Sequence, residues 1–192
     1  MPIPVVFDTD IGSDIDDTWA LAFLLRCPEL DVKLITTDRG RPEYRAKLAC
    51  QILEAGGRQD LPVGLGTEWE GNTGSNRQEP CAEGYDLAGY AGEVLEDGVQ
   101  ALINTILDSS EQITVVAIGP LPTVAEALRR EPRIAKNARF IGMHGSLRLG
   151  HKQDRQNVIA EANVVNDPKA CQAVFEANWP VTITPLDTCG IV

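Results

Sequence analysis

Strand-length apolar runs alternate with helical patterns along almost the whole chain, and this alternation restricts the possible folds more than any other feature. The apolar runs lie at residues 2–8, 31–38, 61–66, 112–119, 138–145 and 179–186. The segments with apolar residues at helical spacing lie at 16–27, 42–57, 92–110, 121–132 and 167–178. Strands that alternate with helices favour an α/β fold with an open, mainly parallel sheet flanked by helices.

Residues 68–92 interrupt this alternation. They are rich in Gly, Asn, Glu and Ser, which predicts a long surface excursion. No segment has the composition of a linker, and 43% of the residues are hydrophobic, enough for a substantial core. We therefore expect residues 1–192 to form a single domain.

The charge balance and the cysteine pattern restrict the class of protein. The formal net charge is −11, the sequence pI is about 4.6, and no run of Lys or Arg occurs. We therefore expect no nucleic-acid partner, and instead a cation or a neutral small molecule. The N-terminus does not resemble a signal peptide, and no apolar run reaches the ~18 residues that cross a bilayer. Five widely spaced cysteines without a CxxC pair indicate reduced thiols in a cytoplasmic protein.

Polar turns follow three of the expected strands. The first strand ends at Asp8, the fourth at Gly119 and Pro120, and the fifth near residues 143–146. In open parallel sheets, ligands bind beyond the carboxyl ends of the strands. These three turns are therefore expected to share one ligand-binding edge of the sheet.

Carboxylates are concentrated after the first strand. Five aspartates fall within ten positions, namely Asp8, Asp10, Asp14, Asp16 and Asp17. Carboxylates this close repel one another, which raises their pKa values or costs stability unless a cation offsets the repulsion. Capping of the following helix explains one or two of them, but not five.

A divalent-metal catalytic site explains the cluster better than an EF-hand loop does. Counted from Asp8, Gly12 falls one place early for an EF-hand, and position twelve is Trp19 instead of Glu. Carboxylate oxygens with no Cys or His nearby suit Ca²⁺ or Mg²⁺. Such a site leaves positions open for water and substrate hydroxyls, and a neighbouring carboxylate can deprotonate the water.

Four ordered motifs resemble those of the inosine-uridine-preferring nucleoside hydrolases. DTDIGSDIDD is similar to the family's N-terminal DxDxGxDD, with two extra residues before the final pair, as in bacterial members. LITTDRGRPEYRAKLACQILEAGGRQDLPVGLG resembles the second strand, the helix and the third strand of the family. VVAIGPLPTVAEALRREPRIAKNARFIGMHGS resembles its GPLTN turn and MGG strand, and IAEANVVNDPKACQAVF its AEFN segment. The similarity runs from about Val5 to Cys189 and implies the Rossmann-like nucleoside hydrolase fold.

The resemblance implies a metal site and a catalytic base. Asp10 would bind the metal and take a proton from the attacking water, and Asp17 would be the second metal carboxylate. The backbone carbonyl of Pro122, in the GPLPT turn, would be a further ligand. The expected cation is Ca²⁺, with Mg²⁺ as the alternative.

The resemblance also implies a small-molecule nucleoside substrate. Asp16, Glu161 and Asn163 would bind the ribose hydroxyls, while Asp8 and Asp14 would support the cluster. The expected reaction is metal-dependent hydrolysis of the N-glycosidic bond of ribonucleosides to ribose and free base. Carboxylates would stabilise its oxocarbenium-like transition state. A homo-oligomer and a role in purine and pyrimidine salvage are implied as well.

Three positions depart from the pattern of the family. Arg41 stands where the family usually has Asn near the sugar, and it either stays in solvent or reaches an altered substrate. His144 stands where a second glycine is expected, and it either crowds the pocket or satisfies a hydrogen bond at the strand end. Arg155 lies near the position of a sugar-binding Asn of the family.

The fourth departure is at the C-terminus. The sequence ends at LDTCGIV, before a further aspartate ligand of the family that often has a histidine beside it. We therefore expect either the N-terminal portion of a nucleoside hydrolase-like domain or a shortened homologue. Asp187 is the only carboxylate near the end, and its position predicts a strand-end residue, not a substitute ligand.

Two other functions stay open on the sequence alone. FDTD after a strand also resembles the opening of haloacid-dehalogenase-like phosphohydrolases, with Asp8 as nucleophile and Asp10 as acid and base. That resemblance leaves GPLPT and AEAN unexplained. A non-catalytic calcium- or ribose-binding descendant would instead bind metal and nucleoside without hydrolysis.

Overall fold

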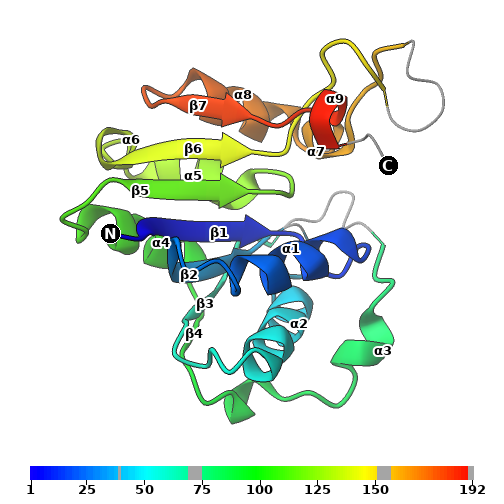
Figure 1. Cartoon of the computed structure of the whole chain (residues 1–192), viewed down its shortest axis with the longest axis vertical. Helices are drawn as coiled ribbons and strands as arrows, with labels where there is room; N and C mark the ends of the chain where they lie inside the picture. The colour runs from blue at the N-terminus through cyan, green and yellow to red at the C-terminus, as the bar shows by residue number, and fades with distance from the viewer. Residues whose placement is uncertain (39, 69–74, 151–156, 190–192) are drawn as a thin grey trace.

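The computed structural model contains a sheet of seven parallel strands in the order β4-β3-β2-β1-β5-β6-β7 (Figure 1). The strands are β1 (Ile3–Thr9), β2 (Leu30–Thr37), β3 (Val63–Leu65), β4 (Val94–Leu95), β5 (Ile113–Ala117), β6 (Ala138–Gly142) and β7 (Val181–Ile183). The structure describes residues 1–38, 40–68, 75–150 and 157–189. The predicted α/β fold with an open parallel sheet is confirmed.

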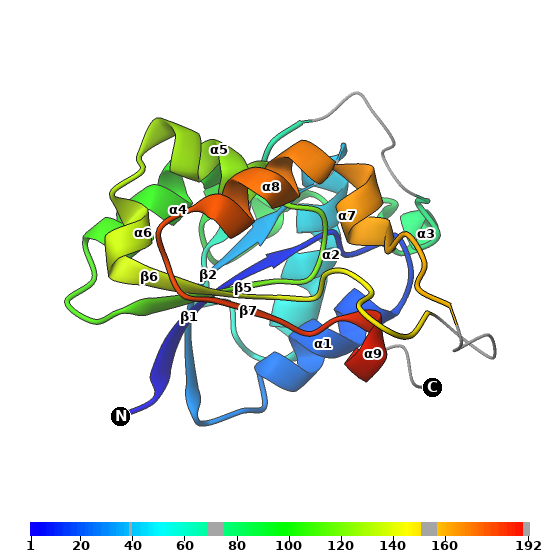
Figure 2. The same ribbon diagram turned by 90° about the horizontal axis from the view of Figure 1, so that it is seen from above.

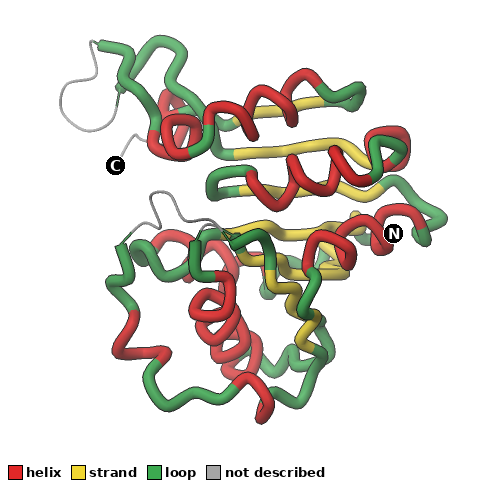
Figure 3. Tube along the Cα trace, turned by 180° about the vertical axis from the view of Figure 1, so that it is seen from behind, coloured by secondary structure: helices red, strands yellow, loops and turns green. Residues whose placement is uncertain are grey.

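Helices cover the two faces of the sheet (Figures 2 and 3). The longer helices are α1 (Asp16–Leu24), α2 (Pro42–Ala55), α4 (Gly98–Leu107), α5 (Pro122–Arg130) and α8 (Pro168–Glu176). Phe7 and Ile35 pack with α1 and α2 in one buried cluster, and Val6 and Leu34 pack with α4, α5 and α8 in the other. This division follows from the alternation of side chains along a strand. No described helix combines the length and the apolar character that a membrane span requires.

Five short helical segments complete the described chain. They are α3 (Glu79–Ala82), the 3₁₀-helix η1 (Leu87–Gly89), α6 (Ile134–Asn137), α7 (Ala162–Asn166) and α9 (Leu186–Cys189). The first two lie in the predicted 68–92 excursion. None of the five was predicted as a helix, because segments this short do not carry a periodic pattern.

The helix predicted at 92–110 begins later, at Gly98, so its predicted start was wrong. Val94–Leu95 instead pairs with β3 as a short edge strand. The Asp97 carboxylate accepts a hydrogen bond from the Gln100 N–H at 2.9 Å and caps α4. The capping aspartate therefore determines where α4 begins, which the spacing of the apolar residues did not locate.

β1 lies where the strand order reverses, because β2, β3 and β4 follow on one side of it and β5, β6 and β7 on the other. The register places Asp8 beside Ala117, and Ala117 beside Gly142. The carboxyl ends of β1, β5 and β6 therefore meet at one edge, as predicted. A reversal of this kind is where open α/β sheets bind their ligands.

Candidate active site at the carboxyl ends of the strands

A cavity of about 600 Å³ lies at this edge of the sheet. Its walls come from the segment between β1 and α1, the first turns of α1, the turns after β5 and β6, residues 159–163, and α9. The predicted site residues that line it are Asp10, Asp14, Asp16, Asp17, Glu161 and Asn163. Residues far apart in the sequence thus surround one cavity, which has the volume typical of a small-molecule site.

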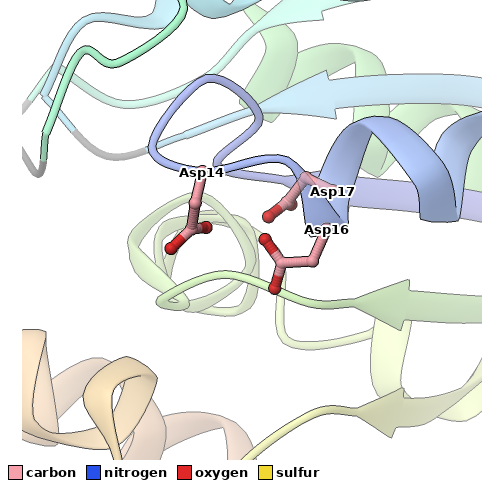
Figure 4. Close-up of side chains that lie close together, drawn as sticks. All are labelled: Asp14, Asp16 and Asp17. Carbon is pink, nitrogen blue, oxygen red and sulfur yellow. The ribbon is translucent and has the colours of Figure 1, made fainter. Parts of the chain in front are cut away.

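Three of the aspartates direct their carboxylates toward one another (Figure 4). One oxygen of each of Asp14, Asp16 and Asp17 lies within 4.8 Å of the others, so a single cation can contact all three. Asp10, which the family resemblance predicts to bind the metal together with Asp17, lines the same cavity but is not part of this group. The N-cap of α1 is Ile15, without a side-chain cap, so N-capping does not account for the cluster.

Burial and mutual repulsion disfavour the charged forms of these carboxyl groups. Burial and the nearby Asp10 raise the pKa of Asp17 well above its usual value, although the Thr9 hydroxyl donates a hydrogen bond to it. The pKa of Asp14 is raised to about 6, mainly by its hydrogen bond with Asp16. A divalent cation would offset both effects, and the donor set consists of hard oxygen atoms. The residues present therefore fit Ca²⁺.

Asp10 is held by the loop that surrounds it. Its side chain is buried, and its carboxylate accepts a hydrogen bond from the Ser13 hydroxyl at 3.2 Å. The fully buried guanidinium of Arg45, on α2, donates to the Asp10 carbonyl, to the Ile11 carbonyl at 2.9 Å and to Ser13 Oγ at 3.2 Å. Arg45 was not predicted from the sequence, because an arginine on a helix is usually exposed.

Asp8 lies behind the cavity beside Asp38, a second residue that was not predicted from the sequence. Both side chains are fully buried, their carboxyl groups are within hydrogen-bonding reach of each other, and the Thr36 hydroxyl donates to Asp8. Burial raises the pKa of Asp8 to about 7 and that of Asp38 well above its usual value. The position of Asp38, at the end of the second predicted strand, was the available signal for it. Because Asp8 does not reach the cavity, it cannot be the nucleophile of a phosphohydrolase.

Glu161 and Asn163 form the opposite wall. The Glu161 carboxylate caps α7 and accepts hydrogen bonds from the N–H groups of Asn163 at 2.8 Å and Gly145 at 3.0 Å. Asn163 Nδ2 donates to the carbonyls of Ile118 at 2.9 Å and Met143 at 3.0 Å. These bonds fix both side chains against the turns after β5 and β6.

Arg41 lies away from this cavity. Its guanidinium forms an ion pair with Glu79 at 2.9 Å and lies over the Tyr44 ring, 5.1 Å from the ring centroid. It lines a separate cavity of about 730 Å³ between α2 and α3. Of the two predicted placements for Arg41, the structure therefore favours the partly solvated one.

His144 is fully buried and does not crowd the cavity. Its Nε2 donates to the Gly119 carbonyl at 3.1 Å, and its ring packs against Phe140 and Phe175. Burial lowers the pKa of His144. Of the two alternatives predicted for His144, the structure therefore contains the hydrogen bond at the strand end and not the crowded pocket.

The remaining predicted residues do not line the cavity. Asp187 lies in α9 and not at a strand end, so that prediction was wrong. Its carboxylate accepts the N–H groups of Leu147 and Arg148, both at 2.8 Å, and holds their turn. Pro122 is buried at the start of α5, and its role as a ligand stays a prediction. Arg155 lies outside the described residues.

Gly119 packs directly against Asp10. A Cβ at this position would lie 2.8 Å from Asp10 Oδ1 and 3.0 Å from the Asp10 backbone nitrogen. We therefore expect Gly119→Ala to displace Asp10 and to weaken Ca²⁺ binding about tenfold, as measured by isothermal titration calorimetry. Gly89→Ala is the control, because its Cβ would meet nothing within 4 Å. Equal affinities in the two variants would contradict the expectation.

The raised pKa of Asp8 predicts a pH-dependent stability for the metal-free chain. Because the folded pKa, about 7, exceeds the model-peptide value of 3.8, the folded state binds more protons between these values. The contribution of Asp8 to the free energy of unfolding is therefore lost as the pH rises through about 7. With chelator present, we expect the stability of the wild type to fall from pH 5.5 to 8 relative to that of Asp8→Asn, as measured by urea unfolding. The lowered pKa of His144 acts in the opposite direction, but it is common to both proteins.

Several known proteins that resemble this chain in sequence and fold are described as nucleoside hydrolases. The profile of the family described as inosine-uridine preferring nucleoside hydrolase matches residues 5–191. The chain is 32% identical to the pyrimidine-specific ribonucleoside hydrolase RihA of Citrobacter koseri and 33% identical to the non-specific ribonucleoside hydrolase RihC of Klebsiella pneumoniae. The alignments cover 97% of this chain, but 61% and 62% of these two relatives. The chain thus spans about three fifths of the length of the curated relatives.

Solved structures agree with the sequence comparison. A plant nucleoside hydrolase superimposes with a TM-score of 0.79 at 28% identity, over 97% of this chain and 61% of its own. The inosine-uridine preferring nucleoside hydrolase of Bacillus anthracis gives a TM-score of 0.77 at 22% identity, over 96% of this chain and 65% of its own, and supports the fold alone. The chain belongs to the inosine-uridine preferring nucleoside hydrolase family.

Proposed function

We propose that this chain takes part in the metal-dependent hydrolysis of the N-glycosidic bond of ribonucleosides, giving ribose and free base. The observation that carries the proposal is the cavity lined by Asp10, Asp14, Asp16 and Asp17, in a chain of this family. The acidic cluster favours Ca²⁺, with Mg²⁺ as the alternative. When bound, the cation supplies positive charge that offsets the carboxylate repulsion and makes nearby water more acidic.

In this proposal, the residues divide into three roles. Asp10 and Asp17 hold the cation together with the carbonyl of Pro122, and Asp10 accepts the proton of the attacking water. Asp16 binds ribose hydroxyls on one wall, and Glu161 and Asn163 bind them on the other.

The chemistry follows from these positions. The oxygen of a water molecule, which gives one proton to Asp10, attacks the anomeric carbon of the ribose as the bond to the base nitrogen breaks. The bonding electrons leave with the base, which takes up a proton from solvent, so that ribose and neutral base are released. Carboxylates at the cavity wall stabilise the positive charge that develops on the sugar. Asp8 and Asp14 support the cluster without contacting the reacting atoms.

We further propose that the protein acts in the cytoplasm, in purine and pyrimidine salvage, as a homo-oligomer. The cysteines within the described residues are free thiols, which suits a reducing compartment. The two relatives act, by their names, on ribonucleosides. Light scattering coupled to size-exclusion chromatography tests the oligomer, and a monomeric mass would contradict it.

Ribose release from inosine, uridine, adenosine and cytidine tests the proposed reaction. We expect release by this chain with Ca²⁺ and none with chelator. Folded protein that binds Ca²⁺ but releases no ribose would contradict hydrolysis by this chain and favour a binding protein. Absence of both binding and release would reject the metal site.

A further inference from the structure

A side-chain amide from the 68–92 excursion lies against the loop that carries the aspartates. Gln78 Nε2 donates a hydrogen bond to the backbone carbonyl of Asp14, and Gln78 Oε1 accepts one from the Thr18 hydroxyl at 3.1 Å. The two bonds hold both ends of segment 14–18, which contains the aspartates of the first turn of α1. Donor and acceptor of the amide are therefore both used on this one segment.

Neighbouring contacts keep this part of the excursion in place. Ser75 Oγ donates to the Ser13 carbonyl at 2.6 Å. The Tyr44 hydroxyl donates to the Gly12 carbonyl at 3.0 Å and receives a hydrogen bond from the Gln78 backbone. The backbone of Gln78 is thus fixed independently of its side chain, so a change of the side chain alone removes only the two amide bonds.

Segment 14–18 needs such support, because its own residues oppose the arrangement. Three carboxylates with oxygens within 4.8 Å repel one another, and no side chain caps α1 at Ile15. Without a bond at the Asp14 carbonyl, the segment could relax and move its carboxylates apart. Groups that orient metal ligands in this way typically contribute strongly to metal affinity.

We propose that Gln78 is a positioning residue that holds segment 14–18 so that Asp17 stays directed at the cation that it shares with Asp10, and Asp16 stays directed at the sugar. The proposal rests on the proposed function in taking Asp17 as a ligand of the cation and Asp16 as a residue that binds the ribose hydroxyls. It assigns no chemical step to Gln78.

Gln78→Met tests the proposal, because Met has a similar length but lacks the amide donor and acceptor. We expect the dissociation constant for Ca²⁺, measured by isothermal titration calorimetry, to rise about 10- to 100-fold. Where the wild type releases ribose, high Ca²⁺ should restore the lost activity of the variant. Gln51→Met is the matched control, since Gln51 Nε2 ties the excursion to α2 through the Cys81 carbonyl at 2.9 Å, and we expect no change in Ca²⁺ affinity.

Thr18→Val serves as a second variant, because it removes the hydrogen bond between the Thr18 hydroxyl and Gln78 Oε1 by changing its donor. Combined with Gln78→Met, it should weaken Ca²⁺ binding by less than the product of the single effects, because both act on one bond. If Gln78→Met does not fold by circular dichroism, the affinity of Thr18→Val decides.

Three outcomes separate this proposal from the proposed function. Unchanged Ca²⁺ affinity in the folded variants would overturn the role of Gln78 and leave the hydrolase intact. Wild-type Ca²⁺ binding without ribose release, with weakened binding in Gln78→Met, would support Gln78 and reject hydrolysis by this chain. No Ca²⁺ binding by the wild type would overturn both.

Discussion

Asp10→Asn is expected to lower ribose release by at least about 10³-fold without disturbing the fold. The amide keeps the shape of the side chain, and its oxygen can still accept the Ser13 hydrogen bond. The amide cannot take a proton from water, and the substitution removes a negative charge from the cavity wall that faces the sugar. The measurement is kcat/KM for the best nucleoside at saturating Ca²⁺.

Asp31→Asn is the control for this comparison. Asp31 lies on β2 and pairs with Lys33 at the surface, outside the cavity, so its substitution should leave the rate unchanged. Wild-type turnover by Asp10→Asn would assign the proton transfer to another carboxylate. A rate loss of similar size in both variants would point to a general effect of removed charge.

Arg45→Met is expected to reduce the free energy of unfolding by about 3 to 5 kcal/mol, the usual cost of removing one partner from a buried charged network. The substitution leaves the carbonyls of Asp10 and Ile11 without their charged donor inside the core. It also leaves the buried Asp38 without the nearby cation that lowers its pKa. Urea unfolding, with chelator present, measures the effect.

Arg129→Met is the matched control for Arg45→Met. Arg129 is exposed on α5 and pairs with Glu126 at 2.6 Å, so its loss should change the stability by less than about 1 kcal/mol. A stability of Arg45→Met within that range would show that the loop after β1 does not depend on Arg45. We expect instead that the variant also binds Ca²⁺ more weakly, because the loop carries Asp10.

The fold was predictable because two signals agreed along the chain. The apolar runs matched β1, β2, β5 and β6 closely, and the helical spacing matched α2, α5 and α8. The edge strand Val94–Leu95 was not predicted, since it is too short to show an alternating pattern. Where helix and strand signals overlapped, before Gly98, a single capping aspartate decided the boundary.

The site was predictable where function depends on residues in one short segment. The aspartates from Asp8 to Asp17 carry their own signal, because their mutual repulsion needs a cation to offset it. Arg45 carries no such signal, and Asp38 carries only its place at a strand end, since a charged residue on a helix or at a strand end is ordinary until the fold buries it. The contact between Gln78 and Asp14 joins residues 64 apart, and no local pattern reports such a pairing.

The position of β1 has a consequence for how the site persists in solution. β1 is hydrogen-bonded to β2 on one side and to β5 on the other. Amide protons in such central strands typically exchange with solvent only at free energies close to global unfolding, whereas short helices and loops exchange through local openings. Asp8 lies within this slowly exchanging strand and Asp10 directly follows it. We therefore expect Asp10 to be anchored next to amides that exchange slowly, whereas the amides of the short helices around the cavity, such as α7 and α9, exchange through local openings.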